Sequence, residues 1–243
     1  MNEKQDMLDS VYIHVKRYGK IKSLDKIIKA MSIIDRKFFV PKSIVSVAYA
    51  DTALPIGYGQ TISQPSTVAT MLLLAELKRG LDVLEVGAGS GWNASLIQYL
   101  VHPGKVIAIE RISSLAVKAR KNIEMLEKYL KRNKFEEFIK LKPLKIDIDD
   151  ALNENSKIWS NSYDRIIITA GIPFDIEIEK TIQKMADSLL KRNGIMLCPE
   201  VEGPIRIYKK NTELVLKETI DCLLYTSDAA DEGLGVDLGG RRI

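Results

Sequence analysis

Alternate glycines after a short apolar run limit what this chain can fold into more than any other feature of its sequence. The run covers Leu81–Val86, and Gly87, Gly89 and Gly91 follow it directly, ahead of a segment with helical periodicity. Glycine accepts positive φ angles and lets a ligand approach the backbone closely. The order of strand, glycine turn and helix therefore predicts a cofactor-binding loop. Its expected cofactor contacts are Glu85, Gly87, Ala88, Gly89 and Gly91.

An acidic residue closes the next apolar run. The segment Lys105–Glu110 ends in Glu110, nineteen residues after Gly91, where a carboxylate accepts hydrogen bonds from ribose hydroxyls. The Gly-x-Gly-x-Gly spacing differs from the Gly-x-Gly-x-x-Gly spacing of pyrophosphate-binding loops, which favours S-adenosylmethionine over NAD as the cofactor. We therefore expect Glu110 and Arg111 to contact S-adenosylmethionine. The alternative is a glycine turn that binds no ligand.

Strands and helices alternate along the central part of the chain, as in a parallel sheet covered by helices. Gly19 separates two helical segments near the start, Ser23 is the expected N-cap of the second, and residues 38–61 form an irregular segment. The expected helices are Glu3–Tyr18, Ser23–Ile34, Pro65 to about Leu77, Trp92–Val101, Ser113 to about Leu130 and Asp175–Leu190. The expected strands are Leu81–Val86, Lys105–Glu110, Phe138–Ile146, Tyr163–Thr169 and Ile195–Val201, followed by an antiparallel hairpin of Ile205–Lys209 and Leu214–Ile220.

The predicted fold class is α/β and Rossmann-like. It has a mostly parallel central sheet, an antiparallel C-terminal hairpin and a helical N-terminal appendage. Ligands of such open sheets bind beyond the carboxyl ends of the strands. Gly87–Gly91, Glu110, Asp147 and Thr169–Pro173 all lie at the carboxyl ends of expected strands, so we expect them to meet at one edge of the sheet.

Composition argues against several classes of protein. With 243 residues, of which 46% are hydrophobic, the chain can bury a sizeable core. Its apolar runs are too short to cross a bilayer, and the charged start MNEKQDMLDS lacks the apolar region of a secretory signal. Cys198 and Cys222 have no metal-ligand spacing. We therefore expect a cytoplasmic, monomeric protein with no metal site and no membrane partner.

A basic segment raises the question of nucleic acid. Lys118–Lys145 holds ten Lys or Arg residues and four Asp or Glu residues. A solvated helix face is the preferred interpretation, and a strip that binds a polyanion is the alternative. The segment has few aromatic residues and no nucleic-acid motif, and the net charge of the chain is only +4. We therefore expect no nucleic-acid partner.

A set of motifs surrounds the glycine loop. They are Phe39-Val40-Pro41, Asp51, Leu54-Pro55-Ile56-Gly57, Gly59-Gln60-Thr61-Ile62-Ser63-Gln64-Pro65, EVGAGSG at 85–91, and TAGIP at Thr169–Pro173. Together they resemble the protein-L-isoaspartate O-methyltransferase family over about Arg36–Ile220. The resemblance implies transfer of the methyl group of S-adenosylmethionine to the α-carboxylate of L-isoaspartyl residues in damaged proteins, which serves protein repair. It implies that isoaspartyl proteins and peptides are the partners.

The resemblance also suggests which residues act. Ser63 matches the family's active-site serine, and Thr61 offers a second hydroxyl to hold a carboxylate, so these two are the expected catalytic residues. Free N–H groups at the start of the helix after Pro65 would help to bind the same anion. The alternative is that Ser63 only caps that helix. The expected substrate contacts are Asp51, Ile62, Thr169, Ala170 and Pro173, and the alternative for Asp51 is to tie down the loop.

One motif departs from the family. Where the family has Gly-Asp-Gly, this chain reads KIDIDDAL, so the acid that faces the adenine is either Asp147 or Asp149. Asp147 is the expected contact. The missing glycines change the shape of this loop.

The last segment differs in composition from the rest of the chain. Four of the fifteen glycines lie in the last eleven residues, and CLLYTSDAADE resembles one reading frame of a transposase sequencing adapter. The expected organisation is N-terminal helices and substrate loop in 1–62, a Rossmann-like methyltransferase domain in 63–221 and a foreign tail in 222–243. A natural flexible tail is the alternative. Two other functions are a methyltransferase for nucleic acid or a small molecule, and an inactive cofactor-binding module.

Overall fold

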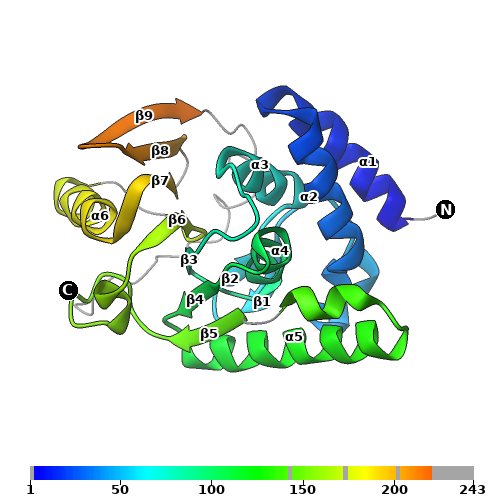
Figure 1. Ribbon diagram of the computed structural model, residues 1–243. Coiled ribbons are helices and arrows are strands. Elements are labelled where there is room, and N and C mark those ends of the chain that lie inside the picture. Colours follow the sequence, from blue (N-terminus) through cyan, green and yellow to red (C-terminus); the bar gives the residue numbers. More distant parts are fainter. Residues whose placement is uncertain (1–2, 142–143, 172–174, 201–202, 221–243) are drawn as a thin grey trace.

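A seven-stranded sheet forms the centre of the molecule (Figure 1). The computed structural model describes residues 3–141, 144–171, 175–200 and 203–220. The strands are β3 (Val83–Val86), β4 (Val106–Glu110), β5 (Leu144–Ile148), β6 (Tyr163–Ile168), β7 (Leu190–Pro199), β8 (Ile205–Lys210) and β9 (Leu214–Ile220). Their order is β5-β4-β3-β6-β7-β8-β9, parallel from β5 to β7 and antiparallel from β7 to β9. The predicted fold class is confirmed.

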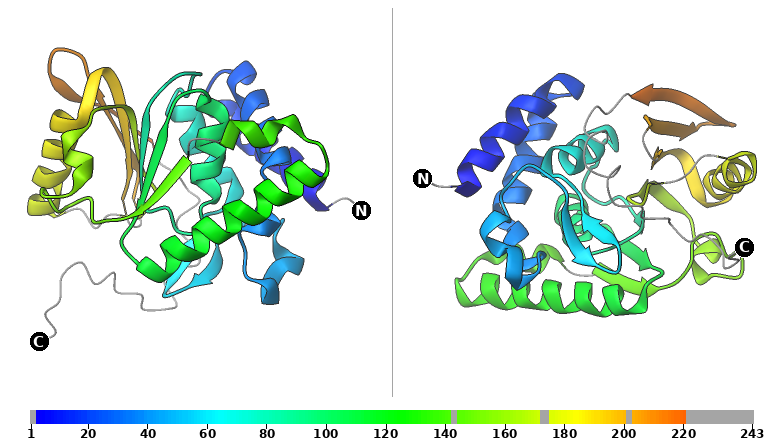
Figure 2. Two further views of the ribbon diagram at one scale, coloured as in Figure 1. Left: turned by 60° about the horizontal axis from the view of Figure 1, so that its bottom comes forward. Right: turned by 180° about the vertical axis from the view of Figure 1, so that it is seen from behind.

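Helices cover both faces of the sheet (Figure 2). The helices are α1 (Glu3–Val15), α2 (Ile21–Ile33), α3 (Pro65–Leu74), α4 (Trp92–Val101), α5 (Ser113–Arg132) and α6 (Ile176–Leu189). Successive strand residues point to opposite faces. Val83 therefore packs into the core formed with α1 to α5, whereas Leu84 packs into the core formed with α6. This explains why the strands read as nearly continuous apolar runs.

The predicted cap of α2 is wrong. This helix begins at Ile21 after Lys20, and Ser23 lies inside its first turn, where the Ser23 amide donates to Lys20 O. The cap at α6 follows the expected chemistry, since Asp175 accepts a hydrogen bond from the Ile178 amide at 2.8 Å.

The segment predicted as irregular contains regular structure. A short 3-10 helix, η3, covers Lys42–Val47, and a hairpin of β1 (Leu54–Gly57) and β2 (Gln60–Ile62) follows it. The turn of the hairpin has three consecutive positive φ angles, at Gly57, Tyr58 and Gly59. Gly57 and Gly59 therefore permit a tight turn between two short strands.

The strand predicted at Phe138–Ile146 begins later than expected. Residues Glu136–Leu141 form a 3-10 helix, η4, and β5 runs from Leu144. Leu141 is 1% exposed and lies in the core with α4 and α5, so burial beside these helices competes with pairing at the sheet edge. Asp147 consequently lies within β5, opposite Ile109, rather than after the end of a strand.

The described ranges contain no helix that is both long and apolar enough to span a membrane. The predicted tail, 222–243, lies outside the described residues.

Candidate active site

Three glycines shape the loop between β3 and α4. Gly87, Gly89 and Gly91 have φ angles of 97°, 51° and 85°, which disfavour any side chain. A Cβ on Gly87 would lie 3.2 Å from Thr169 Oγ1 and 3.3 Å from the Ala170 amide nitrogen. The loop therefore packs directly against the carboxyl end of β6.

Glu110 braces this loop from the end of β4. Its Oε2 accepts a hydrogen bond from the Gly89 amide and its Oε1 accepts one from the Ile112 amide, both at 2.9 Å. A carboxylate has about four lone-pair sites, so each oxygen keeps capacity for a ligand hydroxyl. The predicted ribose contact fits this position, and the support of the loop is a second role that the sequence does not reveal. Arg111 is exposed in the bend after β4.

Glu85 is buried in β3 beside Asn93, which lies in the first turn of α4. Its Oε1 accepts a hydrogen bond from Asn93 Nδ2 at 2.8 Å. Glu85 Oε2 and Asn93 Oδ1 are also buried and have no partner within the described part of the chain. Burial raises the pKa of Glu85 to about 8; the Asn93 hydrogen bond opposes the shift, and the charge of Glu110 adds to it. Two buried acceptors beside the glycine loop thus lack a donor.

Asp51 caps α3. Its Oδ1 accepts a hydrogen bond from the Ser66 amide at 2.8 Å, and its Oδ2 accepts one from Ser66 Oγ. The alternative in which Ser63 caps α3 is wrong, because the N-cap position is Gln64 and its side chain makes no capping bond. Of the two alternatives for Asp51, the structure shows the tie to the loop. We predicted that free N–H groups at the start of α3 help to bind the substrate carboxylate. This prediction is wrong for the Ser66 amide, because it already donates to Asp51.

The two expected catalytic hydroxyls lie on the second strand of the hairpin and just before α3. Thr61 is exposed on β2, and Ser63 is half-buried just before α3. The Ser63 side chain makes no hydrogen bond with the described residues. Ile62, between them, is 4% exposed and belongs to the core. Both hydroxyls therefore stay available to a substrate, whereas Ile62 holds β2 in place.

The hairpin rests on the glycine loop. Ile56 of β1 is 1% exposed, and its Cδ1 lies 3.5 Å from the position of a Cβ on Gly89. Lys118 Nζ in α5 donates to Ile56 O at 2.8 Å. Arg120 in the same helix donates to Ile146 O at 2.9 and 2.6 Å. Lys118 is half-buried, so the interpretation of this basic segment as a solvated face is wrong for that side chain, whereas Arg120 is exposed and also binds a main-chain carbonyl.

Thr169 supports the loop from β6. Its hydroxyl donates to Gly87 O at 2.6 Å and lies 3.0 Å from Val86 O. Ala170 follows it and is exposed. Contacts of Thr169 and Ala170 with substrate stay predictions, and Pro173 lies outside the described residues.

The two candidate acids near the adenine differ in their surroundings. Asp149 accepts hydrogen bonds from the Asp150 amide at 2.9 Å and from Ser156 Oγ at 2.5 Å. Asp147 is exposed on β5, the edge strand. Asp149 already accepts hydrogen bonds from its own loop, so the geometry favours Asp147 as the acceptor for the adenine.

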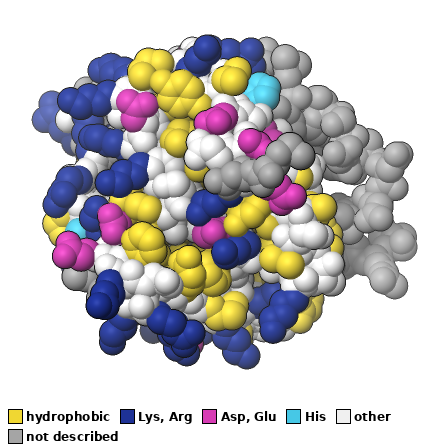
Figure 3. All heavy atoms as spheres, turned by 90° about the vertical axis from the view of Figure 1, so that its right-hand side faces the viewer, with side chains coloured by type: hydrophobic (Ala, Val, Ile, Leu, Met, Phe, Trp, Pro, Cys, Tyr) yellow, Lys and Arg dark blue, Asp and Glu magenta, His cyan; other side chains and the backbone are white. Residues whose placement is uncertain are grey.

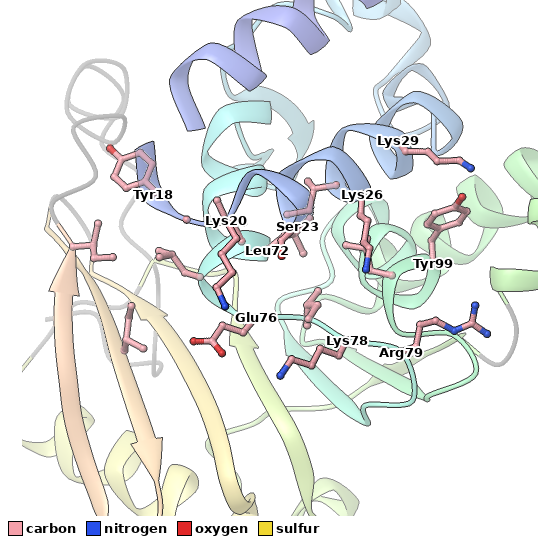
Figure 4. A pocket seen from close by; sticks show the side chains of 18 of the residues that line it. Tyr18, Lys20, Ser23, Lys26, Lys29, Leu72, Glu76, Lys78, Arg79 and Tyr99 are labelled. Atoms are coloured by element: carbon pink, nitrogen blue, oxygen red, sulfur yellow. The ribbon is translucent and has the colours of Figure 1, made fainter. Parts of the chain in front are cut away.

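A cavity of about 930 Å³ lies elsewhere (Figure 4). It opens between the start of α2, the end of α3 and the last two strands, with Lys20, Leu72, Arg79 and Ile220 among its lining residues. None of the predicted site residues lines it. We place the site at the carboxyl edge of the sheet because the glycine loop, Glu85 and Glu110 converge there. The cavity is lined mainly by apolar and basic side chains, the latter including Lys20, Lys78 and Arg79.

Sequence patterns do not single out Arg36, which is 1% exposed and hydrogen-bonded to four carbonyls around the site. The available signal is a run of three charged residues, Asp35-Arg36-Lys37, between two apolar stretches.

Comparison with known families gives a match over most of the chain. The family model described as protein-L-isoaspartate(D-aspartate) O-methyltransferase (PCMT) matches residues 3–225. The matched range ends within the segment 222–243, which we predict to be foreign.

Similar proteins carry the same description. The protein-L-isoaspartate O-methyltransferase of Fervidobacterium nodosum is 35% identical over 214 residues, which cover 86% of this chain and 95% of that protein. That of Methanopyrus kandleri is 40% identical over 188 residues, covering 76% and 73%. A Plasmodium falciparum structure assigned to the same group, solved with S-adenosyl-L-homocysteine, superposes with a TM-score of 0.67 at 24% identity and covers 93% of this chain and 98% of that one. This last likeness concerns the fold.

Proposed function

We propose that this chain, which belongs to the protein-L-isoaspartate(D-aspartate) O-methyltransferase family, binds its cofactor at the edge of β3 and β4 and its substrate along residues 51–66. The enzyme transfers a methyl group from S-adenosylmethionine to the free carboxylate of L-isoaspartyl residues in proteins, a step in protein repair. The observation that carries the residue assignment is the packing of Ile56 on Gly89, which places the substrate segment beside the cofactor loop.

The groups around the glycine loop suit S-adenosylmethionine. The amino-acid part of this cofactor carries an ammonium group, a donor for the unpartnered acceptors Glu85 Oε2 and Asn93 Oδ1. Its ribose carries two hydroxyls. The Glu110 carboxylate can accept hydrogen bonds from them in addition to the two that it accepts from backbone amides. Arg111 and Asp147, near the ends of β4 and β5, complete the proposed contacts.

Methyl transfer to a carboxylate depends on positioning. The acceptor is ionised at neutral pH, so the chain needs no general base. The bound cofactor supplies an activated methyl group, whose bond to sulfur breaks as its bond to the carboxylate oxygen forms. Ser63 Oγ donates to the other carboxylate oxygen and Thr61 Oγ1 provides a second donor. These bonds aim the reacting oxygen.

We also propose a cytoplasmic monomer that does not act on nucleic acid. Cys198 is buried, and burial raises the pKa of its thiol to about 12, which disfavours the reactive thiolate at neutral pH. On the face around α1 and α2, Lys and Arg gather along the left and lower margins of the view, and apolar side chains with fewer acidic ones lie between them (Figure 3). Such a mixed face does not attract a polyanion strongly. Light scattering after size-exclusion chromatography measures the molecular mass and so tests whether the protein is a monomer.

The first experiment is methyl transfer from labelled S-adenosylmethionine to a peptide with one L-isoaspartyl residue. The same peptide with a normal aspartyl residue is the control. We expect label in the isoaspartyl peptide alone. Equal labelling of both peptides, or of neither by protein that binds the cofactor, would refute the proposed substrate.

Ser63→Ala tests the role of the hydroxyl. We expect kcat to fall about 10- to 100-fold, because one group that orients the carboxylate is lost. The cofactor Kd and Tm should not change, since the Ser63 side chain makes no hydrogen bond with the described residues. Ser66→Ala is the matched control, because it removes a hydroxyl that bonds to Asp51 and should lower Tm first. Full activity in the Ser63 variant would remove it from the proposed mechanism.

A further inference from the structure

We infer that Arg36 is a positioning residue that sets Ser63 and the loop before it against the cofactor helix α4, an inference that rests on the proposed function. Arg36 begins the short 3-10 helix η2 (Arg36–Phe38), directly after α2. Its side chain is 1% exposed, so the guanidinium lies inside the protein.

The guanidinium binds the backbone of the substrate segment at four points. Nη1 donates to Ala48 O at 2.8 Å and to Ala50 O at 3.0 Å. Nη2 donates to Thr52 O at 2.9 Å and to Ser63 O at 3.1 Å. One planar group thus fixes the residues on both sides of Asp51 and the backbone of Ser63.

The same side chain contacts the cofactor side of the site. The Arg36 guanidinium carbon lies 5.3 Å from the ring centroid of Trp92, within reach of a cation–π interaction. Trp92 follows Gly91, and its Nε1 donates to Ile34 O at 2.9 Å. Arg36 therefore lies between the helix that begins at the glycine loop and the segment that carries Ser63.

The buried charge of Arg36 constrains the positions of the four carbonyls. Burial lowers the pKa of Arg36 to about 10, and the charge of Asp51 opposes the shift, so the group stays charged at neutral pH. Its Nε is buried and has no hydrogen-bond partner among the residues that the structure describes, and the four hydrogen bonds of the guanidinium go to neutral carbonyls. If one carbonyl moves away, a charged N–H is left unpaired in the interior. The four carbonyls are therefore held together.

Arginine is specifically suited to this task. Its planar fork points several donors in fixed directions, whereas a lysine ammonium has three donors around one atom. Arg36→Lys keeps the charge and cannot reach four carbonyls in the same plane. We therefore expect the backbone of Ser63, which Arg36 Nη2 holds at 3.1 Å, to shift in this variant.

The test compares Arg36→Lys with the wild type on the isoaspartyl peptide. We expect kcat to fall about 10- to 100-fold, because small displacements of a positioning group have effects of this size. KM and the calorimetric cofactor Kd should stay close to the wild-type values. Amide exchange in the peptide 48–63 should become faster.

Arg165→Lys is the matched control. Arg165 is 6% exposed and also donates to carbonyls, those of Ala75 at 2.5 Å, Asp164 at 2.7 Å and Glu76 at 3.4 Å. It lies at the start of β6, at the opposite end of the strand from the candidate site. This variant should lose stability as Arg36→Lys does, but keep its kcat.

The outcomes separate the two claims. An inactive wild type refutes the proposed function, whereas an active wild type with full kcat in Arg36→Lys refutes the positioning role. A loss of kcat that follows the loss of Tm equally in the Arg36 and Arg165 variants also refutes it. If Arg36→Lys does not fold, Arg36→Gln provides the same comparison without a buried charge, and unchanged kcat in that variant is equally contrary to the inference.

Discussion

At the scale of single residues, Glu85 combines a cost in stability with a proposed use in binding. Its folded-state pKa of about 8 lies above the ordinary value of 4.5 because the side chain is buried. Between these two values the folded protein holds a proton that the unfolded chain releases. The free energy of unfolding therefore decreases as the pH rises from about 5 to about 8. A ligand ammonium beside the carboxylate would compensate this cost.

Glu85→Gln should remove the pH-dependent part of this cost. We expect the Tm of the variant, relative to that of the wild type, to increase by several degrees as the pH rises from 5 to 8.5. The cofactor Kd should rise roughly tenfold, because the amide cannot pair with the ligand ammonium as a carboxylate does. Thermal unfolding across this pH range and calorimetry measure the two effects. Parallel Tm profiles would mean that Glu85 does not titrate as the structure indicates.

Glu110→Ala tests the proposed ribose contact. The change removes the acceptor for ligand hydroxyls and the brace on Gly89, so we expect cofactor affinity to fall by about 2–3 kcal/mol. Calorimetry with S-adenosylmethionine measures the loss. Unchanged affinity would place the ribose elsewhere.

At the scale of elements, α3 depends on a cap from a distant part of the chain. Asp51, in the loop before the hairpin, supplies the carboxylate that α3 lacks locally. The helix therefore orders the substrate segment, and the segment in turn stabilises the helix. A change at Asp51 should affect both stability and catalysis.

Asp51→Ala should lower the free energy of unfolding by about 1–2 kcal/mol, the usual cost of losing a cap. It should also lower kcat, because the segment before Ser63 loses an anchor. Asp175→Ala is the matched control, since it removes the cap of α6 away from the proposed substrate segment. Chemical denaturation and peptide kinetics measure both variants. Equal kcat in the two would argue against coupling between the cap and the site.

At the scale of the whole molecule, the described core ends with β9. Ile220 is its last residue and pairs with Ile205 of β8. The two cores on either side of the sheet are built from residues that precede this point. The segment after it has the foreign composition noted above, so it should not contribute to folding.

A chain that ends at Ile220 should therefore keep the Tm and kcat of the 243-residue chain. Removing β9 as well, by ending at Asn211, is the control. That change uncovers the edge of β8 and should lower Tm or cause aggregation. Loss of stability on removal of 221–243 alone would show that this segment packs against the fold.

The sequence by itself determined the order of the parallel strands along the chain, the glycine loop and the positions of its acids. These features are local, because apolar runs, glycine conformations and strand ends depend on neighbours in the chain. Glu110 and Gly89 could be placed together for this reason, as could the antiparallel end of the sheet.

Only the tertiary structure decided which polar groups hold the site. Asp51 rather than Ser63 caps α3, Arg36 holds four carbonyls, Thr169 supports Gly87, and Lys118 binds the hairpin instead of solvent. Each of these bonds joins residues that are far apart in the sequence. The physical reason is that a buried donor or acceptor must find a partner, and only the packing of the elements brings that partner within reach.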